Sequence, residues 1–239
     1  MKTFYFMSSL PRSGSTLLST LLNQNPNIYS PEQDTDLVTS MDFYETNIVN
    51  YESASAGVHS HSYFQVLGDM AKSFYKDIDK PIIIDKNRSW GLERGLNLAK
   101  YVSQTPKVVF VYRPIIEILT SWITLCEMNP NNFIDNSIKN LDLNPRNYRP
   151  INDVRCDAIM NFQIERYLNI YTQALKDKTT FQLVSYNEII TNPQETLNNI
   201  YKFLNIPEYE HNSNSIIKVN NWDDNFAFGI DTLHEVRPT

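Results

Sequence analysis

A stretch rich in hydroxyl side chains near the start of the chain carries one arginine and one glycine. Residues 8–16 read SSLPRSGST; they follow the apolar run Phe4–Met7 and lead into a leucine-rich helical pattern from Thr16 to Leu22. A loop between a buried strand and the first turn of a helix brings backbone N–H groups, hydroxyls and the positive end of a helix dipole to one point. This arrangement predicts a site for a phosphoryl or sulfuryl group.

The same loop lacks the lysine with which nucleotide hydrolases hold a triphosphate. Gly14 and Thr16 match the pattern G-x-x-x-x-G-K-[ST]. Ser9, however, replaces the first glycine, and Ser15 replaces the lysine. The cation that this loop offers is Arg12, which suits a differently placed anionic group. An ordinary turn rich in serine and glycine is the alternative interpretation.

Two further cations follow predicted strands. Lys86 lies just past the apolar run Ile82–Ile84, and Arg113 lies directly after Val108–Tyr112. Open α/β sheets bind ligands at the carboxyl ends of their strands, so both side chains are placed to contact one. Ser121 follows Arg113 after about two helical turns, a spacing at which a guanidinium and a hydroxyl can hold a second anion. A solvated lysine and an arginine paired with a carboxylate are the alternatives.

Apolar runs and helical patterns alternate along the chain. A fourth apolar run lies at Phe181–Val184, and helical patterns lie at Thr16–Leu22, Trp90–Val102, Ile115–Cys126, Ala158–Leu175 and Pro193–Leu204. Strands that alternate with helices need crossover connections, which place helices on both faces of a mostly parallel sheet. The expected fold class is therefore α/β with three layers.

The chain shows no sign of division into separate units. No long Gly/Ser linker or internal repeat interrupts it, so we expect one domain over residues 1–239. Three polar, weakly periodic segments are predicted to be long loops. They are Asp42–Tyr63, Asn129–Asp153 and Glu210–Thr239.

Composition argues against several classes of partner. Lys+Arg 21 against Asp+Glu 27 gives a net charge of −6, so we expect no nucleic-acid partner, and any phosphate site must concentrate its donors locally. The two cysteines, Cys126 and Cys156, lie in helical apolar patterns and are interpreted as small buried residues of a protein in a reducing compartment. The first apolar stretch is too short for a signal peptide, and no run reaches the ~18 residues of a membrane helix. A cytoplasmic protein without a membrane partner is expected.

At the phosphate loop the chain resembles the superfamily of sulfotransferases that use 3′-phosphoadenosine 5′-phosphosulfate (PAPS). Residues 11–18, PRSGSTLL, are similar to the loop with which the family holds the 5′-phosphosulfate. Arg12 resembles the branch of protein-tyrosine and glycan sulfotransferases, whereas the small-molecule cytosolic branch carries lysine there. The resemblance implies a P-loop type sulfotransferase fold whose donor is bound by Arg12, Ser13, Gly14, Ser15 and Thr16.

The resemblance extends to later parts of the chain, from residue 3 to about residue 207. Arg113 and Ser121 resemble the family's 3′-phosphate clamp, although Pro114 follows the arginine without the usual intervening acidic residue. Lys86 matches a lysine that contacts the transferred group. Residues 184–189, VSYNEI, resemble a Tyr-Glu-Asp-Leu segment, which implies that Tyr186 packs near the nucleotide. A core aromatic side chain is the alternative for this tyrosine.

The activity implied by the resemblance is in-line transfer of a sulfuryl group from PAPS to a hydroxyl or amine acceptor. Arg12 and Lys86 would neutralise the charge that grows on the departing 5′-phosphate oxygen. No metal is expected, because the donor has no triphosphate chain and the sequence shows no cluster of ligands at metal-binding spacing. The acceptor and the oligomeric state are not indicated.

A hydroxyl acceptor needs a general base. The segment after the first helix offers the polar side chains of Glu32, Gln33, Asp34 and Asp36. We favour Glu32 ahead of Asp34, because one short helix joins this segment to the phosphate loop. His59 and His61 are the alternatives, since the small-molecule branch uses a histidine.

Two other classes of function stay open. A small kinase or ATPase on a similar scaffold is disfavoured by Ser15 at the position of the phosphate-binding lysine. A catalytically inactive adaptor would keep the fold and bind the nucleotide without turnover.

Overall fold

Residues 2–49, 60–144, 148–212 and 228–230 are described by a computed structural model of the chain. At its centre lies a five-stranded parallel sheet with the order β2-β3-β1-β4-β5. The strands are β1 (Thr3–Ser9), β2 (Ile28–Tyr29), β3 (Ile82–Lys86), β4 (Val108–Tyr112) and β5 (Phe181–Ser185). The four predicted strands are confirmed, whereas the two-residue β2 has too little sequence pattern to be predicted.

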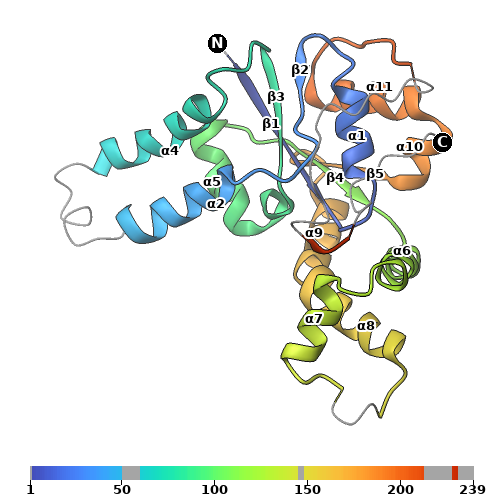
Figure 1. Cartoon of the computed structure of the whole chain (residues 1–239). Helices are drawn as coiled ribbons and strands as arrows, with labels where there is room; N and C mark the ends of the chain where they lie inside the picture. Colours follow the sequence, from blue (N-terminus) through green and yellow to red (C-terminus); the bar gives the residue numbers. More distant parts are fainter. Residues whose placement is uncertain (1, 50–59, 145–147, 213–227, 231–239) are drawn as a thin grey trace.

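Helices surround this sheet (Figure 1). They are α1 (Ser15–Leu22), α2 (Leu37–Tyr44), α4 (Ser60–Phe74), α5 (Glu93–Val102), α6 (Ile115–Met128), α7 (Phe133–Asn140), α8 (Ile151–Ile159), α9 (Glu165–Lys176), α10 (Tyr186–Thr191) and α11 (Pro193–Leu204). Shorter π-helical or 3-10 segments are η1 (Glu45–Val49), η2 (Arg88–Gly91) and η4 (Met160–Ile164).

Alternate side chains of each strand enter two separate apolar clusters. Phe6, Ile83 and Phe110 belong to the larger cluster, which packs against α2, α4, α5, α6, α8 and α9. Their neighbours Met7 and Ile84 belong to the other cluster, which packs against α1 and α11. Because successive side chains of a strand point to opposite faces, the two clusters lie on the two faces of the sheet. The predicted three-layer α/β fold is confirmed.

Two of the predicted loops contain helices. The range 42–63 includes the end of α2, all of η1 and the start of α4, and 129–153 includes α7 and the start of α8. In Figure 1, α2 and α4 extend side by side from one flank of the sheet, and α7 and α8 extend together from another. Both ranges are rich in Asn or Ser, which is why the sequence pattern alone predicted loops, although α7 has a clear apolar side with Phe133, Ile134 and Ile138. Within 210–239, the structure describes only residues 210–212 and 228–230.

The two cysteines lie in helices, as predicted. Cys126, on α6, is buried, and burial raises the pKa of its thiol to about 11. Cys156, on α8, is half-buried. The first thiol is therefore an inert apolar filling of the core.

The strand register brings the predicted functional residues to one edge of the sheet. Lys86 of β3 is aligned with Met7 of β1, and Tyr112 of β4 is aligned with Ser185 of β5. The carboxyl ends of four adjacent strands therefore lead into the segments that carry Arg12, Lys86, Arg113 and Tyr186. The chain moves from β1 to β2 and β3 on one side and then crosses to β4 and β5 on the other, so β1 lies at the switch point of the sheet.

Candidate functional site

The loop between β1 and α1 has a tightly folded backbone. Arg12 and Gly14 both adopt positive φ, 56° and 90°. Gly14 precedes the first residue of α1, and a Cβ atom there would lie only 2.5 Å from Cδ2 of Tyr186. The hydroxyl of Ser13 donates to the carbonyls of Leu10 (2.6 Å) and Val111 (3.1 Å). The Ser13 side chain therefore fixes the loop, and Gly14 lets it pass close under an aromatic ring.

Arg12 reaches from this loop to the helix that follows β4. Its Nε donates to Oγ of Ser121 on α6 at 3.3 Å. The prediction from spacing paired Ser121 with Arg113, but in the structure the serine contacts Arg12. This contact connects the phosphate loop to the helix that follows β4.

Lys86 enters the same region from β3. It is only 3% exposed, and its Nζ donates to Oγ1 of Thr16 at 3.2 Å and to the carbonyl of Glu32. The pKa of this amine is lowered to about 8, mainly because burial disfavours the charged form. The charge of Arg88 adds to the lowering, and the charges of Asp34 and Glu32 partly offset it. Lys86 is therefore not a solvated lysine. Its charge is held inside the protein next to the first turn of α1, where it can attract an anion.

The acidic segment between β2 and α2 lies against Lys86. Glu32 is 2% exposed, its Oε1 accepts a hydrogen bond from Thr20 at 3.4 Å, and its carbonyl also accepts from Thr16 at 3.2 Å. Asp34 is partly exposed and pairs with Arg88 at 3.5 Å. Of the two carboxylates favoured as general base, Glu32 is therefore the buried one, bonded to α1 through Thr20, with its backbone carbonyl on Lys86. The charges of both carboxylates act on Lys86, that of Asp34 more strongly.

The other proposed bases lie elsewhere. Asp36 occupies the position before the first residue of α2, and its side chain makes no capping hydrogen bond there. Gln33 is half-buried in the segment that carries Glu32. His61 falls in the first turn of α4, but its side chain is outside the described part of the structure, as is the whole of His59. The histidine alternatives therefore stay predictions.

Arg113 follows β4 and lies over Tyr186, the first residue of α10. Its guanidinium carbon is 4.2 Å from the centre of the tyrosine ring, and its Nε donates to Oε2 of Glu117 at 2.8 Å. Because the same ring packs against Gly14, a continuous set of contacts runs from the phosphate loop to Arg113. The structure thus brings Arg113 to the predicted site. It also pairs this arginine with a carboxylate, which was the alternative interpretation.

Sequence reasoning missed three neighbours of the site. Glu117 lies four residues after Arg113 on a helix, so the i, i+4 rule could have found it. Arg88 and Thr20 carried no signal, because their contacts with Asp34 and Glu32 join segments distant in the sequence.

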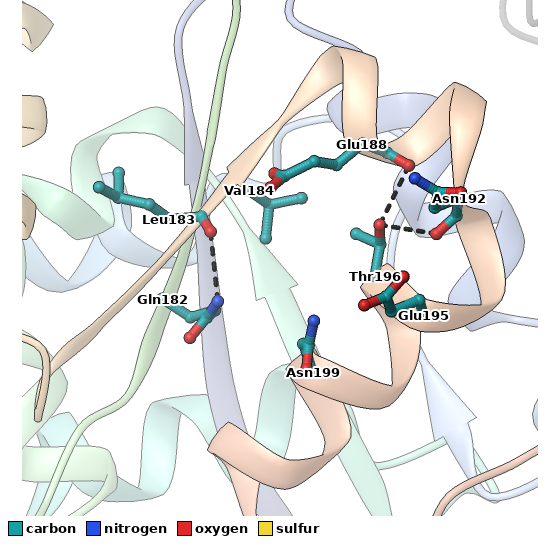
Figure 2. Close-up of a pocket in the computed structure, with 8 residues that line it drawn as sticks. All are labelled: Gln182, Leu183, Val184, Glu188, Asn192, Glu195, Thr196 and Asn199. Atoms are coloured by element: carbon teal, nitrogen blue, oxygen red, sulfur yellow. Dashed lines mark hydrogen bonds between the residues drawn. The ribbon is translucent and has the colours of Figure 1, made fainter.

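A separate polar hollow of about 180 Å³ lies between β5 and the helices α10 and α11 (Figure 2). It is lined by Gln182, Leu183, Val184, Glu188, Asn192, Glu195, Thr196 and Asn199. Figure 2 shows the hydroxyl of Thr196 donating to the carbonyls of Glu188 and Asn192, at 3.0 and 2.8 Å, so this side chain serves the corner between two helices. The hollow shares no residue with the predicted site.

Fold and site together define a three-layer α/β protein whose cations and hydroxyls gather at the carboxyl edge of its sheet. A model of the sulfotransferase family matches residues 5–211 of the chain. This chain belongs to the sulfotransferase family, which confirms the resemblance found in the sequence.

Solved structures support the same fold. The sulfotransferase domain from the curacin biosynthetic pathway is 16% identical with a TM-score of 0.52, over 88% of this chain and 76% of that one. The sulfotransferase domain of the Synechococcus PCC 7002 olefin synthase is 17% identical with a TM-score of 0.51, over 87% of this chain and 75% of that one. A sulfotransferase from Alicyclobacillus acidocaldarius is 12% identical with a TM-score of 0.54, over 92% of this chain and 88% of that one.

A search of curated proteins found no match to the chain. Among the helices in the described residues, none combines the length and the apolar character needed to cross a membrane.

Proposed function

We propose that this chain transfers a sulfuryl group from PAPS to a hydroxyl or amine acceptor. The observation that carries the proposal is the convergence of Arg12, Lys86, Arg113 and Tyr186 at the ends of four adjacent strands. Arg12 contacts Ser121, and Lys86 contacts Thr16. Tyr186 contacts both Gly14 and Arg113. Such an array can hold an elongated ligand with an anionic group at each end.

The phosphate loop is the proposed site for the donor's 5′-phosphosulfate. The N-terminus of α1 directs its backbone N–H groups and dipole at an anion there, and the side chains of Ser15 and Thr16 lie in its first turn. Ser13 contributes its backbone N–H group, because its hydroxyl is committed to two carbonyls. Arg12 and Lys86 supply the charge that the reaction needs.

Arg113 is the proposed ligand of the 3′-phosphate, with Ser121 nearby on α6. The stacking of Arg113 on Tyr186 holds the guanidinium in a defined plane, and the phenyl ring offers a surface for the nucleoside. Glu117 accepts from Nε of this guanidinium at 2.8 Å, which leaves the Nη groups for the phosphate but places a negative charge next to it.

In the proposed reaction the acceptor oxygen attacks sulfur in line with the bond from sulfur to the 5′-phosphate oxygen. That bond breaks, its electron pair stays on the 5′-phosphate, and adenosine 3′,5′-bisphosphate leaves. Lys86 and Arg12 stabilise the growing charge, and Glu32 accepts the proton of a hydroxyl acceptor. Lys86 can do this because its low pKa still leaves it charged below about pH 8.

A phosphoryl transferase is the second candidate from sequence, and the site favours it less. Ser15 is the residue at the position of the triphosphate-binding lysine, and Lys86 lies on the neighbouring strand instead. A thermal-shift experiment with adenosine 3′,5′-bisphosphate, ADP and ATP with magnesium tests the choice. We expect the bisphosphate to give the largest rise in Tm; a larger rise with ATP and magnesium would favour the kinase or ATPase.

A further inference from the structure

Asp85 is a fully buried carboxyl directly before Lys86 in β3, and the proposed reaction does not use it. Its exposed fraction is 0%, and its side chain points to the face of the sheet opposite Lys86. Oδ1 and Oδ2 accept hydrogen bonds from the hydroxyl of Thr35, at 3.0 and 2.8 Å. The hydroxyl of Tyr75 and the indole N–H of Trp90 donate to the same carboxyl.

All three donors are neutral, and they come from three different parts of the chain. Thr35 lies before α2, Tyr75 follows α4, and Trp90 belongs to η2. Burial raises the pKa of Asp85, and the three hydrogen bonds act against that effect. The indole N–H of Trp90 can only donate, so the oxygen that faces it must accept, whereas the hydroxyls of Thr35 and Tyr75 could reorient to accept from an asparagine N–H.

One of the three donors is connected to the candidate site. Thr35 also donates its backbone N–H to the carbonyl of Lys86 at 2.8 Å, and its own carbonyl accepts from Nδ2 of Asn87 at 2.7 Å. Residues 85, 86 and 87 at the end of β3 therefore each hold Thr35. The threonine is three residues after Glu32, whose carbonyl accepts from Lys86 on the other face of the strand.

We propose that Asp85 is a positioning residue, which holds residues 31–36 through Thr35 so that Glu32 keeps its place, with its carbonyl on Lys86 and its carboxylate on α1. This inference rests on the proposed function, because it assigns a purpose to Asp85 in sulfuryl transfer. Trp90 binds the same carboxyl from η2 and connects Asp85 to the core. The Tyr75 hydroxyl also binds it and lies close enough to interact with the Thr35 side chain, but the bond between Thr35 and Asp85 does not pass through Tyr75. Thr35 connects it to the site.

The difference between these donors gives a matched pair of variants. Thr35→Val and Tyr75→Phe each remove one hydroxyl donor to Asp85 and keep the shape of the side chain. Only the first removes the hydrogen bonds between Thr35 and Asp85. Thr35→Ser restores the hydroxyl and is the rescue control, and Asp85→Asn tests the carboxyl directly.

The experiment measures kcat and KM for PAPS cleavage, with water or a simple phenol as the acceptor, in the full chain. We expect Thr35→Val to lower kcat about tenfold with KM for PAPS little changed, because a small misplacement of a catalytic group costs rate. Tyr75→Phe should keep kcat within about twofold of the wild type even at an equal loss of Tm, and Thr35→Ser should restore the rate. Hydrogen exchange of residues 31–36 should rise in Thr35→Val alone.

Equal rates in Thr35→Val and Tyr75→Phe, or equal exchange of residues 31–36, would overturn the role of Asp85. If Asp85→Asn fails to fold, the matched pair still decides the question. A wild-type chain that neither binds nor cleaves PAPS would instead contradict the proposed function, so the two failures can be distinguished.

Discussion

Nζ of Lys86 lies 3.2 Å from Oγ1 of Thr16, so the end of β3 contacts the first turn of α1. The two residues are 70 positions apart in the sequence. The contact places a buried ammonium beside the phosphate loop, where its charge can act on a departing oxygen.

Lys86→Ala should slow PAPS cleavage about 10²- to 10³-fold, the usual effect of losing one donor to a developing oxyanion. Its effect on the affinity for adenosine 3′,5′-bisphosphate should be much smaller, because the product lacks the transferred group. Single-turnover kinetics and calorimetry measure the two quantities. Lys107→Ala is the matched control, since Lys107 lies before β4 at the opposite edge and donates to the carbonyl of Phe203. An unchanged rate in Lys86→Ala would remove this lysine from the site.

The pKa of Lys86 predicts a loss of activity in base. The amine is charged below about pH 8 and loses its charge as the pH rises through that value. kcat/KM for PAPS, which reports the free enzyme, should therefore fall above about pH 8. Lys86→Arg keeps its charge at this pH and should flatten the basic limb even if its rate is low. A wild-type profile that stays level to pH 9.5 would contradict a role for the charged amine.

The same shift predicts how this group affects stability. Because the pKa is lower in the folded chain than in the unfolded chain, the unfolded chain binds more protons between about pH 8 and its ordinary value near 10.5. The contribution of Lys86 to the free energy of unfolding therefore increases with pH in this window. In Lys86→Met this contribution should be absent, which denaturant titrations at pH 7.5 and 9.5 can measure against the wild type.

Glu117 should weaken 3′-phosphate binding, because its negative charge on Nε of Arg113 lies next to the phosphate. Glu117→Gln should tighten adenosine 3′,5′-bisphosphate binding about twofold, as expected from ~0.3–0.5 kcal/mol for an exposed pair. Arg113→Ala should weaken it tenfold or more and remove most of the preference over AMP, since a charge-assisted bond contributes ~1.5–3 kcal/mol. Calorimetry measures both, with Glu127→Gln on the same helix as the control. Equal affinities for the bisphosphate and AMP in the wild type would refute the 3′-phosphate assignment.

The two carboxylates of the acidic segment should differ in their effect on the rate. Glu32→Gln should lower transfer to a hydroxyl acceptor about 10²- to 10⁴-fold, the range for loss of a general base. Asp34→Asn should have a small effect, because Asp34 is partly exposed and pairs with Arg88. Rates with the same acceptor for His59→Ala and His61→Ala complete the set. A collapse in a histidine variant alone would assign the base to the histidines.

The sequence predicted the elements that end at the site better than those that lie around it. The runs that became β1, β3, β4 and β5 are apolar on both faces, as buried parallel strands are, and each ends in a polar loop. Helix α7, the end of α2 and the starts of α4 and α8 lie in ranges rich in Asn or Ser, and these helices pack in pairs, α2 with α4 and α7 with α8. Such packing is not visible in local periodicity.

Individual contacts of the site were also beyond the sequence. Spacing predicted that Arg113 and Ser121 can hold one anion, whereas the contact of the serine with Arg12, which reaches across from another loop, had no signal in the sequence. Asp85 reads in the sequence as an ordinary acid at a strand end. Its burial depends on Thr35, Tyr75 and Trp90, which only the fold brings together.

The central claim is that this chain cleaves PAPS to transfer its sulfuryl group. The most direct measurement is the formation of adenosine 3′,5′-bisphosphate from PAPS with a phenol, a hexose or a primary amine as the acceptor. We predict release of the bisphosphate together with a sulfated acceptor by the wild-type chain, and its loss in Arg12→Ala and Lys86→Ala. Tight binding of the bisphosphate without cleavage of PAPS by any acceptor would contradict the claim and indicate a nucleotide-binding adaptor.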